Sequence, residues 1–207
     1  MTFTCKYDRI SSGDIMINYP NKKKTTNIKI TSTANRGMNF ETMINQTNEF
    51  YLDNDLAVIY KKPIPIQIVS VDYRVRSAAK IVEAYYKLPS TTDYNGIYKG
   101  RYIDFEAKET KSKTSFPIKN IHEHQVLHLE KVKKHGAISF VIVYFSVLGR
   151  IFFLDSDYLV QYYNLSKTGK KSIPLEEFET YGYEIKEGYR KPVDYLQIID
   201  QYYIKTP

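Results

Sequence analysis

The stretch Tyr102-Ile103-Asp104-Phe105-Glu106-Ala107-Lys108 decides the fold, because its side chains alternate strictly between polar and apolar. Alternate side chains of a β-strand point to opposite faces of the sheet. The four polar residues therefore share one face of a predicted strand, and the three apolar residues share the other. The strand ends in a Glu-x-Lys pair, so that two carboxylates and an ammonium lie close together on the polar face.

An earlier acid, Asp93, precedes this strand. The segment Tyr94-Asn95-Gly96-Ile97 follows it, and Asn-Gly is a strong signal for a β-hairpin turn. We therefore predict that a turn at Asn95-Gly96 brings Asp93 beside Glu106. Paired carboxylates suit a hard divalent cation, and a nearby lysine suits the charge that develops on a phosphate. The same spacing also fits the solvated face of an edge strand, so that the pattern alone leaves both interpretations open.

The rest of the chain predicts a mixed α/β domain. Helices are expected over residues 37–49, 76–87, 120–134, 155–164, 175–180 and 192–203. Strands are expected over residues 57–60, 91–94, 97–99, 101–108, 137–145 and 150–154. Residues 61–71 carry Pro63 and Pro65, which exclude a central strand and favour an extended edge segment. Helices and strands that alternate in this way indicate one domain with a sheet covered by helices.

Composition limits the possible partners. The chain has 207 residues and a net charge of +7, of which the first 30 residues supply +4. We expect residues 1–34 to form a flexible basic arm. The charge favours an anionic partner but does not separate nucleic acid from a membrane surface or simple solubility. No apolar run is long enough to span a membrane, and the single cysteine, Cys5, fits a reducing cytoplasm.

Basic and aromatic residues are interleaved over residues 61–90. This composition suits an element that grips a nucleic-acid backbone and stacks on bases. A helix with a solvated basic face would look the same. The basic residues are Lys61, Lys62, Arg74, Arg76, Lys80 and Lys87, and the aromatic residues are Tyr73, Tyr85 and Tyr86.

The predicted helix over 120–134 carries a cluster of histidines. His124 and His128 are four residues apart, a spacing that can bind zinc. A contact with DNA phosphate or simple helix packing explains the cluster better. On the same helix Gln125 falls on the apolar side, where a buried amide needs partners. It is either a satisfied core amide or a contributor to a metal site.

Several stretches of the chain closely resemble the RecU family of Holliday-junction resolvases. The resemblance is carried by residues 35–38 with Glu41, 61–69, 89–96, 102–110, 115–117, 122–125 and 192–196. It covers roughly residues 35–200, in order along the chain. Arg74 departs from the family pattern, where proline is expected, and this puts the shape of that loop in question.

The resemblance implies a restriction-endonuclease-like fold of the PD-(D/E)xK type, a mixed sheet flanked by helices. Residues 35–207 would form this nuclease domain, with a projecting stalk inserted at about residues 62–89. The resemblance further implies a Mg²⁺ ion, replaceable by Mn²⁺, held by Thr91, Asp93, Glu106 and Gln125. Lys108 would stabilise the transition state, and Glu41 would support the water or a second metal. Contacts with DNA would come from Arg36 together with the basic and aromatic residues of the insert.

The implied function is that of a cytoplasmic homodimer that makes paired nicks across four-way DNA junctions in recombination and repair. Other recombination proteins are then expected partners. Two alternatives share the same residues. One is a catalytically inactive accessory protein that binds junctions, and the other is a restriction-type endonuclease that cuts linear duplex DNA.

Overall fold

The computed structural model describes residues 38–73, 76–87 and 91–204. The predicted basic arm over residues 1–34 lies outside this part of the chain, as do Arg36 and Arg74. The side chain of Arg76 is also outside it. Within the described ranges no helix is long and apolar enough to cross a membrane.

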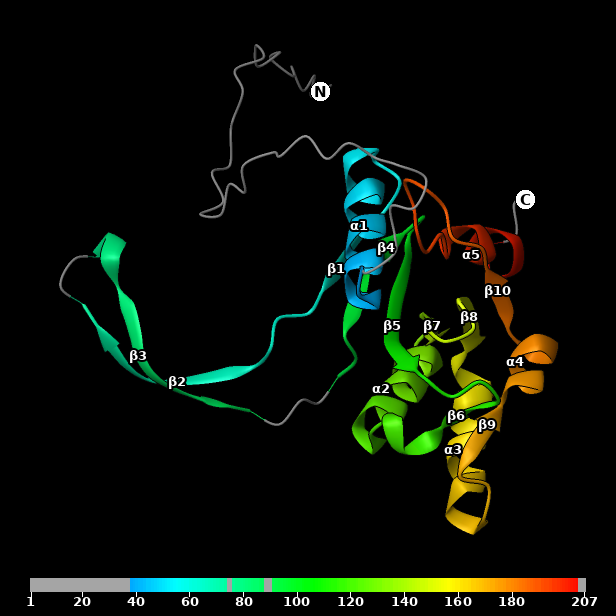
Figure 1. The fold of residues 1–207 in the computed structure, drawn as a ribbon. Helices are drawn as coiled ribbons and strands as arrows, with labels where there is room; N and C mark the ends of the chain where they lie inside the picture. Colours follow the sequence, from blue (N-terminus) through cyan, green and yellow to red (C-terminus); the bar gives the residue numbers. More distant parts are fainter. Residues whose placement is uncertain (1–37, 74–75, 88–90, 205–207) are drawn as a thin grey trace, which may run out of the picture. The chain divides into compact units, whose positions relative to one another are not determined.

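A six-stranded mixed sheet forms the centre of the fold (Figure 1). Its order is β1 (Val58–Lys61), β4 (Tyr94–Tyr98), β5 (Arg101–Thr110), β7 (Ile138–Phe145), β8 (Arg150–Asp155) and β10 (Tyr183–Ile185). Neighbouring strands are antiparallel except β5 and β7, which are parallel. A short separate pair joins β6 (Ser115–Pro117) to β9 (Ser172–Pro174). The prediction of a mixed α/β sheet flanked by helices is confirmed.

Helices cover both faces of the sheet. One hydrophobic core lies under α1 (Phe40–Asp53) and α5 (Leu196–Tyr202), and the other lies under α2 (Glu123–Lys134), α3 (Ser156–Thr168) and α4 (Leu175–Tyr181). The central strand β7 shows why both cores form. Phe140 and Ile142 enter the first core, whereas Val141 and Val143 enter the second. A continuous apolar run therefore marks a strand that is buried on both faces.

A row of aromatic rings fixes the orientation of β5. Tyr94, Phe105, Phe140 and Phe153 stack in succession across β4, β5, β7 and β8, with ring centroids 4.9, 4.8 and 4.1 Å apart. Each such pair contributes roughly 0.5–1.5 kcal/mol beyond its buried area. A register slip of a single residue would turn every side chain of β5 to the other face and break this row. The row therefore also determines where the polar side chains of β5 point.

The insert is a two-stranded ribbon, and the prediction of a helix over 76–87 is wrong. β2 (Ile66–Asp72) pairs antiparallel with β3 (Lys80–Tyr86), and a 3₁₀ turn (Arg76–Ala78) lies between them. Alanines in this segment favour a helix locally, but β-branched and aromatic side chains suit a strand once a partner strand is present. Apart from half-buried Val71, the side chains of both strands are exposed.

The predicted turn at Asn95-Gly96 is also wrong, because both residues lie within β4. The reversal between β4 and β5 is at Lys99 and Gly100, which have φ values of 47° and 73°. Gly96 is required for a different reason, which is its close approach to β1. A Cβ atom there would lie 2.0 Å from the carbonyl oxygen of Val58 on β1. Glycine at this position lets two backbones approach closely.

Candidate active site

β5 brings Glu106 and Lys108 together on the sheet face that lies under α2. Phe105 is held in the opposite core, so that its neighbours along the strand point the other way. The Glu106 side chain has no exposed surface, and the Lys108 side chain is 20% exposed. Lys108 Nζ lies 2.8 Å from Glu106 Oε1. The predicted Glu-x-Lys pair is thus a buried carboxylate with an ammonium that remains accessible at one side.

Asp93 joins this pair from the segment that precedes β4. Its backbone N–H donates to Glu106 Oε2 over 3.2 Å, and its own side chain is half-buried. The two acids therefore lie next to each other, although the chain reversal that brings them together is not where the sequence predicted it. Asp93, Glu106 and Lys108 form one cluster across β4 and β5.

The protonation of Glu106 reflects this setting. Burial raises the pKa of Glu106 to about 8, the neighbouring Asp93 adds to the rise, and the Lys108 ammonium opposes it. Desolvation disfavours a carboxylate unless positive charge compensates it. The site therefore holds more potential negative charge than Lys108 alone balances, which is the condition under which a cation binds.

The donors of the cluster fit a divalent cation with oxygen ligands. Glu106 Oε1 is buried and receives no hydrogen bond of ordinary geometry, with Lys108 as its ionic partner. Within residues 38–73, 76–87 and 91–204, no three His, Cys, Asp or Glu side chains gather into a metal site. Asp93 and Glu106 would thus supply two carboxylates, and neutral oxygens would complete the shell. Mg²⁺ accepts such incomplete protein coordination, whereas structural zinc does not.

The two neutral residues predicted as metal ligands form other hydrogen bonds in the structure. The Thr91 hydroxyl donates to the carbonyl oxygen of Thr92 over 3.4 Å. Gln125 is buried, and its Oε1 accepts the backbone N–H of His122 over 3.1 Å at the start of α2. The amide that the sequence placed on the apolar side of the helix therefore caps the first turn. To bind a metal through Oε1, Gln125 would have to give up its hydrogen bond with the backbone N–H of His122.

Thr92, which the sequence did not single out, is the buried threonine of this segment. Its hydroxyl donates to Asp104 Oδ1. The sequence predicts a strand over residues 91–94, but the chain bends at Thr91 and Asp93, and β4 begins at Tyr94. Alternation along a regular strand therefore does not identify Thr92 as the buried threonine.

Glu41 lies in the first turn of α1 and forms an ion pair with Lys61, with 2.6 Å between Oε1 and Nζ. Both side chains are partly exposed. Burial raises the pKa of Tyr94, and the charges of Glu41, Asp93 and Glu106 raise it further. The charges of the three acids thus all influence the same phenol.

The residues predicted to contact DNA are in different settings. Lys80 and Tyr85 are exposed on β3, and the Tyr85 hydroxyl donates to Glu83 over 2.7 Å. Lys61 is exposed beside Glu41. Lys62 differs from all of these, because its side chain is only 16% exposed and its ammonium points into the protein. Among the predicted DNA contacts whose side chains the structure describes, Lys61, Lys80 and Tyr85 are thus the exposed ones.

The histidines of α2 do not form a zinc site. His128 Nε2 lies 3.0 Å from Asp104 Oδ2, whereas His124 Nε2 is buried without a hydrogen-bond partner. Burial lowers the pKa of His124, and the nearby charges of His122 and Lys108 lower it further. His122 and His124 stack with ring centroids 5.6 Å apart. The cluster packs α2 against the polar face of β5.

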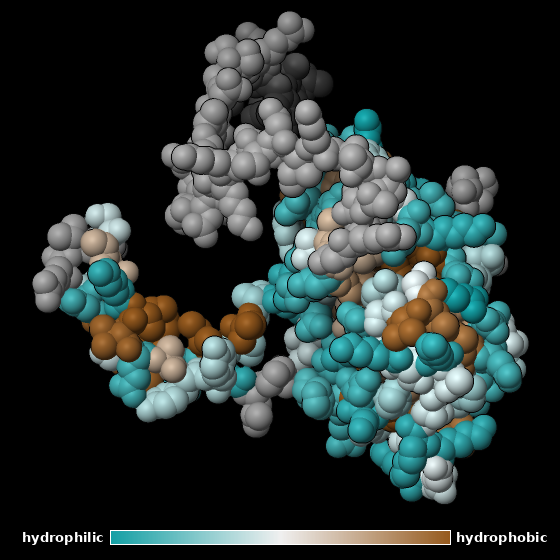
Figure 2. Space-filling view, in the orientation of Figure 1, coloured by the Kyte–Doolittle hydropathy of each residue, from teal (hydrophilic) through white to brown (hydrophobic). Residues whose placement is uncertain are grey.

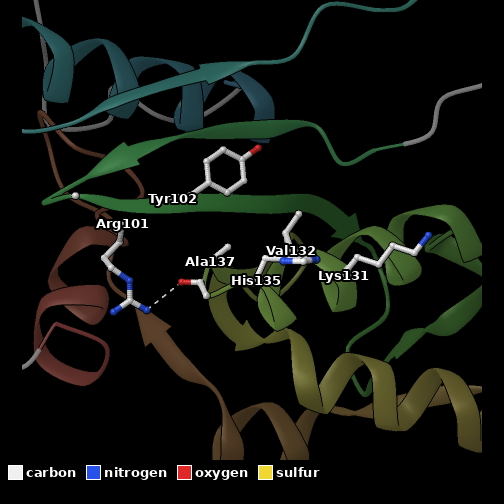
Figure 3. A pocket seen from close by; sticks show the side chains of 8 residues that line it. Arg101, Tyr102, Lys131, Val132, His135 and Ala137 are labelled. Carbon is white, nitrogen blue, oxygen red and sulfur yellow. Dashed lines mark hydrogen bonds between the residues drawn. The ribbon is translucent and has the colours of Figure 1, made fainter.

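A cavity of about 570 Å³ lies at the other end of β5 (Figure 3). Its lining comes from Gly100, Arg101, Tyr102, Lys131, Val132, His135, Gly136 and Ala137. Arg101 donates to the carbonyl oxygen of Gly136 over 3.1 Å. In Figure 3 the Lys131 side chain points away from Arg101. The cationic groups therefore do not converge, and no carboxylate lines the cavity among the described residues. Carboxylates beside a lysine occur instead at Asp93, Glu106 and Lys108.

Comparisons with known proteins show which family the chain resembles. A family model described as Recombination protein U matches residues 35–201. The Holliday junction resolvase RecU of Geobacillus sp. (strain WCH70) is 53% identical over 171 residues, covering 82% of this chain and 85% of that protein. The Holliday junction resolvase RecU of Bacillus cereus (strain B4264) is 47% identical over 196 residues, covering 90% and 98%. Among solved structures, the Holliday junction resolvase Hjc of Archaeoglobus fulgidus matches 69% of this chain and 94% of its own, with 13% identity and a TM-score of 0.41.

Proposed function

The chain belongs to the RecU family of recombination proteins, and on that premise we propose that it is a Holliday junction resolvase. It would act as an endonuclease that nicks paired strands across four-way DNA junctions during homologous recombination and repair. The relatives that carry this name are about half identical to the chain over most of its length. We place the protein in the cytoplasm, where its DNA substrate and other recombination proteins would be its partners.

One observation carries the proposal: a buried carboxylate, Glu106, lies between Asp93 and the ammonium of Lys108. The arrangement has the Asp and Glu-x-Lys groups of restriction-type nucleases, on a mixed sheet flanked by helices. Asp93 and Glu106 would hold Mg²⁺, with Mn²⁺ as a substitute and with Thr91 and Gln125 as further ligands. The bound ion would supply Lewis-acid chemistry at the scissile phosphate and ease the deprotonation of water.

The protein's own groups have separate tasks in this reaction. Lys108 is partly exposed beside Glu106, so that its ammonium can face a phosphate and stabilise the charge that grows in the transition state. Asp93 and Glu106 would hold the divalent cation that assists the reaction at that phosphate. Glu41 would orient the attacking water or support a second metal. Lys61, Lys80 and Tyr85 would grip the DNA, together with Arg36, Arg74 and Arg76.

We further propose that the protein acts as a homodimer. A four-way junction has two-fold symmetry, and a two-fold dimer presents one active site to each of two opposed strands. The ribbon supports this proposal. Figure 2 shows apolar surface along it. Its exposed apolar side chains include Ile66, Ile68, Ile81 and Val82. Exposed apolar clusters of this kind are typical of surfaces that a partner covers.

Two alternatives would leave the fold unchanged. An inactive junction-binding protein has no need of an intact ion pair between Glu106 and Lys108, and that pair is present. A restriction-type endonuclease would use the same chemistry on linear duplex DNA. A cleavage assay with a synthetic four-way junction and a linear duplex of the same sequence, each with and without Mg²⁺, separates the three. We expect cleavage of the junction alone, and only with Mg²⁺.

A further inference from the structure

Asp104 is a buried carboxylate that the proposed reaction does not use. It has no exposed surface. The Thr92 hydroxyl donates to its Oδ1. Three groups surround its Oδ2: Lys62 Nζ at 2.8 Å, the Tyr102 hydroxyl at 2.9 Å and His128 Nε2 at 3.0 Å. A buried carboxylate persists only when its oxygens are hydrogen-bonded and its charge is balanced. This one meets both conditions.

Lys62 supplies the balancing charge, and it also holds the chain next to the active site. Its ammonium donates to Thr92 Oγ1 over 2.8 Å as well as to Asp104. Its backbone N–H donates to the carbonyl oxygen of Asp93 over 2.7 Å. A single residue thus contacts both members of the Thr92–Asp93 peptide, from the main chain and from the side chain.

The contacts continue from this peptide to the proposed metal ligands. The backbone N–H of Asp93 donates to Glu106 Oε2 over 3.2 Å. A continuous network therefore runs from Lys62, through Asp93, to Glu106. Lys62 also lies between β1 and the start of β2 at Ile66, so that it joins the base of the ribbon to the carboxylates.

The adjacent lysine shows that this arrangement is specific to one side chain. Lys61 is the last residue of β1 and pairs with Glu41 near the surface. Lys62 points the opposite way and reaches Asp104. Removal of Lys62 would leave Asp104 buried without the cation that its charge requires, whereas an exposed lysine can be lost without such a consequence.

We propose that Lys62 and Asp104 are positioning residues that fix the Thr92–Asp93 segment, so that Asp93 and Glu106 face the same cation. This inference rests on the proposed function of that site. Lys62 then serves the metal site from within the protein instead of contacting DNA. Partners that orient metal ligands typically change metal affinity by about 10–100-fold when they are removed.

The test is a calorimetric titration of Mg²⁺, and separately of Mn²⁺, into the full-length protein without DNA. We expect Lys62→Met and Asp104→Asn each to weaken metal affinity by about tenfold or more. The double variant should be little weaker than either single variant, because both remove the same link. Lys134→Met is the matched control. Lys134 is 69% exposed and pairs only with Glu130 on its own helix among the contacts of the described residues, so that its loss should change metal affinity less than about twofold.

A second measurement separates positioning from a contact with DNA. In a gel shift with a four-way junction in EDTA, Lys62→Met should bind as Lys134→Met does, within about twofold. Unchanged metal affinity in Lys62→Met and Asp104→Asn would overturn the proposal. If Lys62→Met also bound the junction more weakly than Lys134→Met, Lys62 would be a DNA contact instead. If either variant fails to fold, Thr92→Val removes the shared hydroxyl at nearly constant shape. It too must lose metal affinity severalfold, and an unchanged affinity counts against the proposal.

The outcomes for the wild-type protein keep the two proposals apart. A wild-type protein that binds no metal would overturn both of them. If the wild-type protein binds metal but leaves junctions uncut, only the resolvase proposal fails. The comparison of metal affinities then still decides whether Lys62 and Asp104 position Asp93.

Discussion

At the scale of single residues, the active site depends on how one buried carboxylate is charged. Glu106 has Asp93 on one side and Lys108 on the other. Burial raises the pKa of Glu106 to about 8. Lys108 opposes this effect, since it lowers the pKa of Glu106. The two residues are thus electrostatically coupled, and each can be tested through the property that it controls.

Lys108→Ala should lower the single-turnover rate of junction cleavage by about 10²–10³-fold, the range for removal of one transition-state donor. Its affinity for Mg²⁺ should change little, because Asp93 and Glu106 remain. Rates across a Mg²⁺ titration at pH 9 check this, since Glu106 is then ionised in the wild-type protein. A rate restored by extra Mg²⁺ would mean that Lys108 organises the metal instead of stabilising the phosphate.

The stability of the metal-free protein should fall as pH rises, because the pKa of Glu106 is higher in the folded protein than the ordinary value of 4.5. A neutral Glu106 stabilises the fold fully below pH 4.5, and this contribution is lost as pH rises through about 8. Between pH 6 and pH 9 the loss should be on the order of 2–3 kcal/mol.

Urea unfolding in EDTA at the two pH values measures this loss, with Glu106→Gln as the reference. The variant cannot ionise at this position, so that it should lack this part of the pH dependence and gain on the wild-type protein at pH 9. Equal changes of unfolding free energy in the two proteins would show that Glu106 does not titrate as its burial requires.

At the scale of elements, the sequence was informative wherever a local pattern decided the structure. Strict alternation predicted β5 and the shared face of Glu106 and Lys108, and the continuous apolar run predicted β7. Short strands such as β10 were missed, because three residues carry no readable period. Local propensity predicts a helix over residues 76–87, because it does not include the pairing of β3 with β2.

Side-chain networks were the other part that the sequence did not show. The sequence does not distinguish Lys62 from Lys61. In the structure Lys62 balances the charge of buried Asp104, whereas Lys61 lies near the surface. The buried threonine of this segment is Thr92, because the chain bends at Thr91 and Asp93 and does not alternate as a regular strand would. Such choices depend on the three-dimensional neighbours of a residue, which spacing does not encode.

The corrected position of the β4–β5 reversal leads to a test with two glycines. Gly96→Ala should destabilise the protein by about 3 kcal/mol, because the new Cβ would meet β1 backbone atoms at 2.0 and 2.6 Å. Gly100→Ala should cost only about 1–2 kcal/mol, since its surroundings are open and only its φ of 73° is unfavourable. Chemical unfolding of both variants compares the two losses of unfolding free energy. A larger loss in Gly100→Ala than in Gly96→Ala would favour a turn at Asn95-Gly96.

The ribbon and the basic arm should act differently on DNA. Deletion of residues 1–30 removes dispersed positive charge, so that binding to every DNA should weaken and its salt dependence should flatten. Arg76→Ala combined with Tyr85→Ala should instead lower the preference for junction over duplex. The informative quantity is the ratio of the two affinities at fixed salt. A ratio that collapses on arm deletion but survives the ribbon changes would reverse the two assignments.

At the scale of the whole molecule, each copy of the chain has one proposed nuclease site, whereas the proposed substrate has two equivalent strands to cut. The chain supplies Asp93, Glu106 and Lys108 once, and the resolution of a junction requires two cuts. A second copy of the chain is therefore part of the proposed function, with the exposed apolar ribbon as a surface that it can cover. Membership of the RecU family supports the substrate, and the geometry of the site supports the reaction.

The most direct test of this account is to map the cuts in a four-way junction whose strands are labelled one at a time, with Mg²⁺ present. We predict cuts at symmetry-related positions on two opposed strands, and none in EDTA or in a linear duplex. Glu106→Gln is the control, which should bind the junction at least as well as the wild-type protein and leave it uncut. Cleavage of the duplex at the same rate, or full activity in Glu106→Gln, would contradict the account.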